Sequence, residues 1–265
     1  MKRAQFLAWV GFIGLGALLL AGCATVPETG RKQFVMLSAD EETQLGMTSF
    51  DKLKKEVPIS RDAKANAMLQ QVGKRVAAVA QLPNAQWEFV LFDSKEANAF
   101  CLPGGKVGVY TGILPITLNE AGLATVIGHE VAHAVARHGA ERVTDAWLLQ
   151  TGGSLLEAGL ATAKTDPKWQ GALVTAYGVV GTVGVELPFS RAHESEADHI
   201  GLRYLARAGY DPEEAVKFWQ RFAEFNRKTG GAQVPAFLRT HPLDDKRIKQ
   251  LQEWMPEAKA QSRAP

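Results

Sequence analysis

Apolar residues recur at helical spacing along most of the chain. Between residues 61 and 81 they stand at positions 65, 68, 69, 72, 76 and 79, which predicts a helix. The stretch 38–57 opens with Ser38 and, three residues later, Glu41, a capping-box pattern typical of a helix start. The same reasoning predicts further helices over the ranges 119–162, 193–208, 212–228 and 244–254.

Two stretches break the helical pattern and indicate strands. Residues 87–92, WEFVLF, alternate in polarity and are rich in aromatic side chains. Residues 103–114 open with Pro-Gly-Gly, which predicts a turn followed by a second strand. Together the patterns predict one helix-dominated α+β domain over 38–256 with a small sheet of three or four strands, a tether over 23–37 and a disordered tail over 257–265.

Residues 171–189 form an apolar stretch rich in glycine and other small residues. We expect a buried helix or a plug near the core here and not a membrane span. The glycines, the terminal Glu186 and the position between two predicted helices favour this interpretation.

The start of the chain has the order of a secretory signal. Lys2 and Arg3 precede an apolar run that ends at Leu20 and is short for a membrane-spanning helix of ~20 residues. The following letters, LAGC, resemble a bacterial lipobox. This resemblance implies a signal peptide over 1–22 and a lipid anchor on Cys23. Because Ala24 and not Asp follows, we expect the periplasmic face of the outer membrane.

Charge and cysteine content narrow the function classes. The formal net charge of +2 comes from Lys2 and Arg3, and without them 28 basic residues stand against 28 acidic ones. A neutral mature chain lacks the positive surplus that binding to phosphates requires, so nucleic acid is not expected as a partner. After Cys23 only Cys101 remains, inside an apolar run, and we expect it to be buried and not to be a nucleophile.

The most informative stretch is GHEVAHAVARH, residues 128–138. On a helix, His129 and His133 lie on one face, one turn apart, so both imidazoles can reach one Zn²⁺ at ~2.0–2.1 Å. Glu130 can then take the proton of a zinc-bound water that attacks a peptide carbonyl. This is the H-E-x-x-H pattern of zinc peptidases. An apolar helix face has little reason to bury these three groups unless they are paired or bound to metal.

A catalytic zinc needs a third protein ligand and an open fourth position. In the predicted helix SRAHESEADHIG, residues 190–201, Glu194 and Asp198 are four apart and share one face. We therefore assign Glu194 as the third ligand and Asp198 as the hydrogen-bond partner of a ligand imidazole. The alternatives that spacing leaves open are Glu196, His193 and His199.

These two motifs, with three others, resemble the HtpX/Oma-type zinc metallopeptidases, which are relatives of the CAAX prenyl proteases. The bacterial periplasmic lipoprotein branch, LoiP-like and BepA-like, is the most similar. The other three motifs are NAFCLPGGKVGVYTGIL (98–114), RHGAER (137–142) and THPLDDKRI (240–248). The resemblance extends over residues 30–256, with the five motifs in the family's order.

The resemblance implies a gluzincin fold and one Zn²⁺ per chain, held by His129, His133 and Glu194. It also implies that Glu130 is the catalytic glutamate and that Asp198 supports a ligand from behind. An edge strand along 98–114 would flank the active site and pair with the substrate backbone. Its expected residues are Asn98, Gly105, Val107 and Val109.

Two further histidines receive expectations of their own. In the BepA-like branch the loop histidine that matches His241 can approach the zinc. It would either close the open position or stabilise the oxyanion during hydrolysis, and both roles stay open. We expect His138 to be structural, at the helix end beside Arg137 and Arg142.

The leading hypothesis is a lipid-anchored periplasmic zinc endopeptidase that acts on misfolded or misassembled envelope proteins. The alternative is an assembly or binding factor for outer-membrane proteins whose zinc is latent or structural. A permanently bound His241 would favour the alternative, since a structural zinc is closed by four protein ligands. An intramembrane peptidase is disfavoured, because only the chain start and 171–189 are apolar enough to span.

Overall fold

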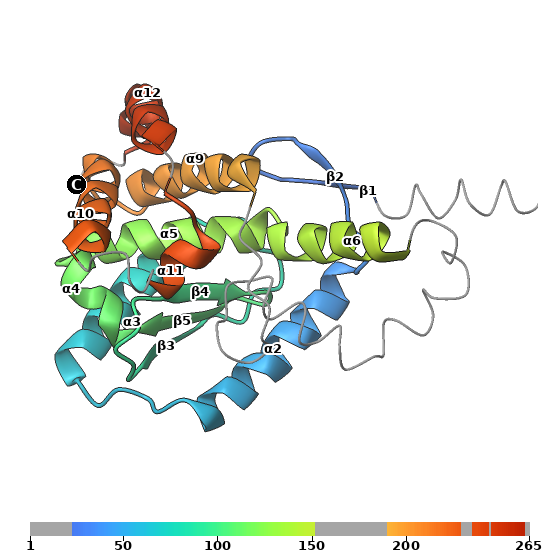
Figure 1. Ribbon diagram of the computed structural model, residues 1–265, viewed down its shortest axis with the longest axis horizontal. Helices are drawn as coiled ribbons and strands as arrows, with labels where there is room; N and C mark the ends of the chain where they lie inside the picture. The colour runs from blue at the N-terminus through green and yellow to red at the C-terminus, as the bar shows by residue number, and fades with distance from the viewer. Residues whose placement is uncertain (1–22, 152–189, 229–234, 244, 263–265) are drawn as a thin grey trace, which may run out of the picture.

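The computed structural model describes residues 23–151, 190–228, 235–243 and 245–262 (Figure 1). The strands are β1 (Cys23–Thr25), β2 (Lys32–Phe34), β3 (Glu88–Phe92), β4 (Ala99–Leu102) and β5 (Lys106–Tyr110). The helices are α2 (Ala39–Glu56), α3 (Ala63–Ala77), the 3₁₀ turn η1 (Thr111–Ile113), α4 (Leu114–Thr117), α5 (Glu120–Val135), α6 (His138–Thr151), α9 (Arg191–Arg207), α10 (Glu213–Lys228), α11 (Ala236–Thr240) and α12 (Asp245–Gln261). This helix-rich arrangement with small sheets confirms the predicted α+β class.

Three expectations lie outside the described residues: the signal peptide, the last part of the predicted 119–162 helix and the apolar stretch 171–189. Within the described part, the 119–162 pattern divides into α5 and α6. The break is at Arg137, whose backbone is left-handed with φ of 56°. None of the described helices combines the length and apolar character that crossing a membrane requires.

Helix α5 is the centre of the domain. Every residue from Gly122 to Val135 is buried, as expected for a helix that is apolar all round. One side of α5 packs on the sheet at β4 and the other side packs on α9 (Figure 1). Asn119 caps its first turn by accepting a hydrogen bond from the Gly122 amide at 2.8 Å. Any polar side chain on α5 is therefore withdrawn from water unless a cleft reaches it.

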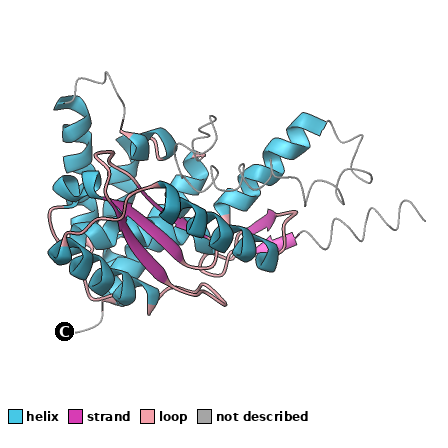
Figure 2. Cartoon of the chain, turned by 90° about the horizontal axis from the view of Figure 1, so that it is seen from below, coloured by secondary structure: helices cyan, strands magenta, loops and turns pink. Residues whose placement is uncertain are grey.

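The three-stranded sheet has the order β3-β5-β4, with β5 parallel to β3 and antiparallel to β4. The resemblance implied an edge strand along 98–114, whereas the Pro-Gly-Gly pattern predicted a turn and then a second strand. The turn is confirmed: Gly104 and Gly105, with φ of 82° and 79°, reverse the chain and divide 98–114 into two strands. Figure 2 shows this sheet among the helices and the two-stranded hairpin apart from it.

The expected substrate-pairing residues are therefore partly wrong. Val107 and Val109 lie on the central strand β5 and are paired on both sides. Gly105 belongs to the turn and its carbonyl accepts from the Glu88 amide at 3.0 Å. Of the four residues, only Asn98 adjoins β4, where its carbonyl accepts from the Tyr110 amide at 3.0 Å. The edge strand beside α5 is β4.

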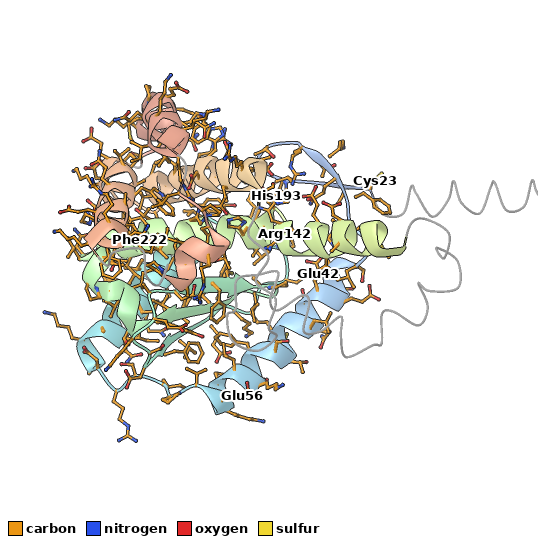
Figure 3. All side chains as sticks on the ribbon, viewed as in Figure 1. Cys23, Glu42, Glu56, Arg142, His193 and Phe222 are labelled. Carbon is orange, nitrogen blue, oxygen red and sulfur yellow. The ribbon has the colours of Figure 1, made fainter. Side chains whose placement is uncertain are left out.

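The ends of the domain are more ordered than the sequence suggested. The 23–37 segment, expected to be a tether, begins with the antiparallel hairpin β1–β2 and buries Val26 and Val35. Cys23 is exposed at the outer end of this hairpin (Figure 3). At the other end, α12 continues to Gln261 and buries Ala258, so most of the expected disordered tail is helical. The prediction of a disordered tail did not recognise that Ala258 is buried, because the residues around it are mostly polar.

Helices α5 and α9 cross with their backbones in contact. A Cβ added to Gly201 would lie 3.0 Å from the His129 amide nitrogen and 3.1 Å from the Gly128 carbonyl carbon. A Cβ on Gly128 would lie 3.1 Å from the Gly201 carbonyl oxygen. Two glycines facing each other thus set the spacing of the two helices that carry the candidate site.

We predict that Gly201→Ala lowers the free energy of unfolding by about 1–3 kcal/mol, because the new methyl group meets backbone atoms that cannot rotate away. Urea denaturation followed by circular dichroism measures this change. Gln252→Ala, on the exposed face of α12, is the control and should leave the midpoint unchanged. An unchanged or higher midpoint for Gly201→Ala would contradict the prediction, since alanine is the better helix former and would then dominate.

Candidate metal centre

The two histidines of the H-E-x-x-H motif point to one position beside α5. Their Nε2 atoms are 3.1 Å apart, and His129 and His133 are both buried. Two ring nitrogens at that distance, without a proton between them, repel unless a cation lies between them. The spacing of four residues thus produces the convergence that the sequence predicted.

Helix α9 supplies a carboxylate to the same position. Ser190 caps this helix by accepting from the His193 amide at 3.1 Å, which places Glu194 in the first turn. The Glu194 Oε1 atom lies 3.3 Å from His133 Nε2, and its Oε2 lies 3.5 Å from His129 Nε2. The close crossing at Gly201 is what brings this carboxylate within reach of the histidine pair.

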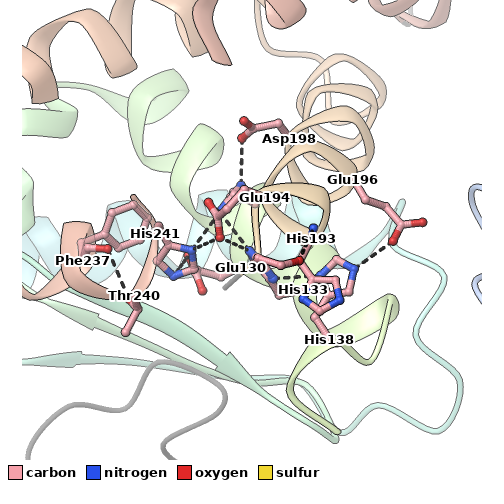
Figure 4. A network of polar contacts seen from close by, with 12 residues as sticks. Glu130, His133, His138, His193, Glu194, Glu196, Asp198, Phe237, Thr240 and His241 are labelled. Atoms are coloured by element: carbon pink, nitrogen blue, oxygen red, sulfur yellow. Dashed lines mark hydrogen bonds and ion pairs between the residues drawn. The ribbon is translucent and has the colours of Figure 1, made fainter. Parts of the chain in front are cut away.

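The other three ligand candidates on α9 face elsewhere. Glu196 bonds to His138 at 2.9 Å, as expected from its place on a different side of the helix (Figure 4). The Nε2 atoms of His193 and His199 pair with Glu141 and Glu257 at 3.1 and 2.9 Å. Of the four ligand candidates on α9, Glu194 is the one that reaches the Nε2 atoms of the histidine pair.

His241 completes the group (Figure 4). Its Nδ1 is 2.9 Å from Glu194 Oε1 and 3.2 Å from His129 Nε2, and its ring is fully buried. The donor atoms of His129, His133, Glu194 and His241 lie within 4.8 Å of one another. Zinc with bonds of about 2.0–2.1 Å would place tetrahedral corners about 3.3 Å apart, and four of the donor–donor distances here are 2.9 to 3.3 Å. The residues fit a tetrahedral divalent metal.

Glu130 stands next to this group. Its Oε1 lies 3.4 Å from His241 Nε2, and the residue is 2% exposed. Burial raises the pKa of Glu130 above its usual range, against the opposite effect of His241 and His129. A carboxylate with a raised pKa is suited to accept a proton near neutral pH and to return it.

Behind His129 lies a pair of charges that only partly follows from the sequence. Asp198 Oδ1 is 3.0 Å from His129 Nδ1, so the carboxylate can fix the tautomer that leaves Nε2 free for a metal. Arg247 was not anticipated. It binds Asp198 Oδ1 at 2.7 Å and Glu194 Oε2 at 3.0 Å, and its guanidinium carbon lies 3.5 Å over the Trp219 ring. Its only sequence signal was its place in THPLDDKRI.

The buried charges set the protonation of the metal-free centre. Burial and Arg247 act to lower the pKa of His129, but Asp198 and Glu194 outweigh them and raise it to about 9. Burial acts to raise the pKa of Glu194, but His241 and Arg247 hold it well below its usual range. The centre therefore pairs a proton on the imidazole with an ionised carboxylate, a site that a cation can occupy in place of that proton.

His241 is held in place by a short helix that leans on the sheet. The Phe237 amide of α11 donates to the Ala97 carbonyl at 3.0 Å, and the Phe237 ring lies 4.5 Å from that of His241. Asn98 turns its carbonyl toward β5, so the preceding carbonyl of Ala97 faces the other edge of β4. Cys101 on β4 is buried, as predicted, and burial together with Glu130 raises its thiol pKa.

Comparison with known proteins agrees with this geometry. Residues 63–255 match the model of Peptidase family M48. The chain is 34% identical over 260 residues to the mitochondrial metalloendopeptidase OMA1 of Schizosaccharomyces pombe, over 97% of this chain and 74% of the relative. With OMA1 of Saccharomyces cerevisiae it shares 30% identity, over 91% and 74%.

A second group of relatives is bacterial. The chain is 29% identical over 231 residues to the beta-barrel assembly-enhancing protease of Escherichia coli K12, over 84% of this chain and 46% of the relative. It thus spans about half of that protein. The family match and the OMA1 relatives cover most of this sequence, and the buried ligand group is of the kind a metallopeptidase requires. The chain belongs to Peptidase family M48, a family of metalloendopeptidases.

Proposed function

We propose that the chain is a zinc endopeptidase whose metal is held by His129, His133 and Glu194. The observation that carries the proposal is the convergence of these three donors at the α5–α9 crossing with Glu130 alongside. Imidazole nitrogens with one carboxylate oxygen, in tetrahedral arrangement, form a donor set that suits zinc. The metal would act as a Lewis acid that polarises a peptide carbonyl and acidifies water.

The chain's own groups supply the remaining chemistry. Glu130 takes a proton from the attacking water and delivers it to the leaving amine. Asp198 keeps the His129 ring oriented, and Arg247 holds both Asp198 and Glu194. Burial strengthens each of these interactions, because little water competes with them.

We place the substrate along β4. This strand has β5 on one side only, among the described strands, and it packs against α5. An extended chain added there would be recognised mainly through its backbone, which suits unfolded or misassembled proteins of varied sequence. All four residues of β4 are buried in this conformation, so pairing requires a more open state. We propose envelope proteins as the substrate class.

The location is proposed from the N-terminal sequence. Cys23 is the last of the lipobox-like letters and is exposed, so a lipid there would not disturb the fold. We infer anchoring at the periplasmic face of the bacterial outer membrane. The relatives' names differ on this point, since one group is mitochondrial and the other is named for β-barrel assembly.

One observation favours the alternative function, an assembly or binding factor with a latent or structural metal. His241 offers a fourth donor and stands beside Glu130, where it closes the position that water or substrate would need. A site with four protein ligands is the arrangement of a structural zinc. We propose that this closure is reversible and that the resting enzyme is latent.

We predict that Glu130→Gln retains one zinc per chain and loses cleavage of an unfolded protein such as casein by roughly 10²–10⁴-fold, the usual contribution of a general base. Metal analysis and a fluorescent casein assay measure the two quantities. Glu253→Gln, at an exposed position of α12, serves as the control. Full activity in Glu130→Gln would remove this residue from its role, and its loss together with the metal would make the role structural.

For His241→Ala we expect several-fold faster casein cleavage with zinc retained, because three ligands remain and the fourth position opens. His199→Ala, whose ring pairs with Glu257 away from the metal, should leave the rate unchanged. A slower rate with zinc retained would instead assign His241 to the chemical step, as an oxyanion stabiliser.

The anchor has a test of its own. Cys23→Ser should move the protein from the membrane fraction to the soluble fraction and abolish incorporation of labelled palmitate. Cleavage of casein by the purified variant should be unchanged, because Cys23 is exposed on the hairpin (Figure 3), whereas the ligand group is buried and does not include it. Membrane association that persists in Cys23→Ser would rule out the lipid as the attachment.

A further inference from the structure

His138 makes a second line of hydrogen bonds to the metal centre, separate from that of Asp198. It was expected only to lie at a helix end. It begins α6, is fully buried, and its Nδ1 lies 2.9 Å from the Nδ1 of His133. Its other nitrogen, Nε2, lies 2.9 Å from Glu196 Oε2 (Figure 4). One imidazole thus bridges a candidate metal ligand and a carboxylate.

A metal held by the ligand group would set the direction of these bonds. His133 turns Nε2 toward the ligand group, so its neutral ring carries the hydrogen on Nδ1. That hydrogen is donated to Nδ1 of His138, which leaves the His138 hydrogen on Nε2, facing Glu196. Each N–H of this series thus donates to one acceptor, and the series ends at the Glu196 carboxylate oxygen, which only accepts.

The line continues into the N-terminal hairpin. Arg31, between β1 and β2, donates from Nε to Glu196 Oε2 at 2.7 Å. Its two terminal nitrogens bind the two oxygens of Glu141 at 2.8 Å each. Glu141 also pairs with His193, whose ring stacks on that of His138 at 4.4 Å. The forked guanidinium therefore fixes both Glu196, which bonds to His138, and Glu141, which bonds to the ring stacked on His138.

The two candidate ligand histidines are thus supported differently. His129 reaches its carboxylate, Asp198, directly. His133 reaches its carboxylate through the additional ring of His138. Groups behind a ligand fix its tautomer and ring orientation and raise its basicity, and their loss commonly weakens metal binding. For His133 this support originates partly in a segment near the start of the described chain.

We propose that His138, Glu196 and Arg31 are positioning residues for His133, so that docking of the β1–β2 hairpin, residues 23–34, completes the metal centre. The proposal rests on the proposed function, in that the centre holds a divalent metal. The metal content of the unaltered chain tests that premise by itself. If the unaltered chain binds no stoichiometric zinc, the proposed function fails; if it does, the variants below decide the inference.

The test uses the full chain and two readouts besides activity: zinc affinity, from competition with a chelating dye, and the visible spectrum of the Co²⁺-substituted protein. We expect His138→Ala to weaken zinc binding by roughly 10–100-fold and to shift the Co²⁺ bands, because the His133 ring loses its orientation. His138→Gln should restore most of both, since its amide can accept from His133 and donate to Glu196.

Arg31→Ala decides whether the hairpin takes part. We expect about tenfold weaker zinc binding, at the lower end of such effects. Lys32→Ala is the matched control, because Lys32 is the neighbouring cation and its side chain donates, among the described residues, to Thr25 of the same hairpin. Wild-type affinity and spectrum in Arg31→Ala would overturn the proposal. So would an equal loss in Lys32→Ala, which would reduce the effect to net charge. If His138→Ala fails to fold, the partly exposed Arg31 still provides the answer.

Discussion

The contact of two glycines, Gly128 on α5 and Gly201 on α9, is the constraint on which the rest of the site depends. It lets two helix backbones touch, and only at that separation can a short carboxylate side chain on one helix reach imidazoles on the other. A wider crossing would leave Glu194 and the histidine pair in separate environments. The chemistry is therefore set first by the absence of side chains at the crossing and only then by the donors beside it.

Placing charged groups in the middle of a domain has a cost in solvation that the structure offsets locally. Glu194, Asp198 and Glu130 are all buried, and each lies within 3.5 Å of a histidine of the site, an arrangement of negative charges that is unfavourable by itself. Arg247 supplies a buried positive charge between two of them, stacked on Trp219. A bound metal would supply the rest. Without a bound cation, the buried carboxylates of the centre are thus only partly compensated by positive charge. A metal requirement of this kind agrees with membership in a metallopeptidase family.

The sequence predicted what short-range periodicity determines. His129, Glu130 and His133 share one helix, and Glu194 and Asp198 share another, so spacing alone could place each set on a face. Pro-Gly-Gly at 103–105 predicted a turn, but the pattern could not show which strand lies at the edge of the sheet, because Ala99–Leu102 and Lys106–Tyr110 are both apolar. Nor could the sequence distinguish Arg247 from the lysines of α12. The sequence does not distinguish an arginine exposed to solvent from one that stacks on a tryptophan, and only the tertiary contacts do so.

The hydrogen bond from Phe237 to the Ala97 carbonyl has a consequence for how the domain can be occupied. That carbonyl faces the side of β4 on which an incoming extended chain would add. A substrate backbone paired with β4 would therefore compete with α11 for one acceptor, and α11 leads directly to His241. Any interaction that strengthens substrate binding to β4 would weaken the contact of α11 with Ala97 by the same free energy, and His241 would lose its support at the metal site. Substrate binding to β4 and the release of His241 from the metal site would then be one coupled equilibrium.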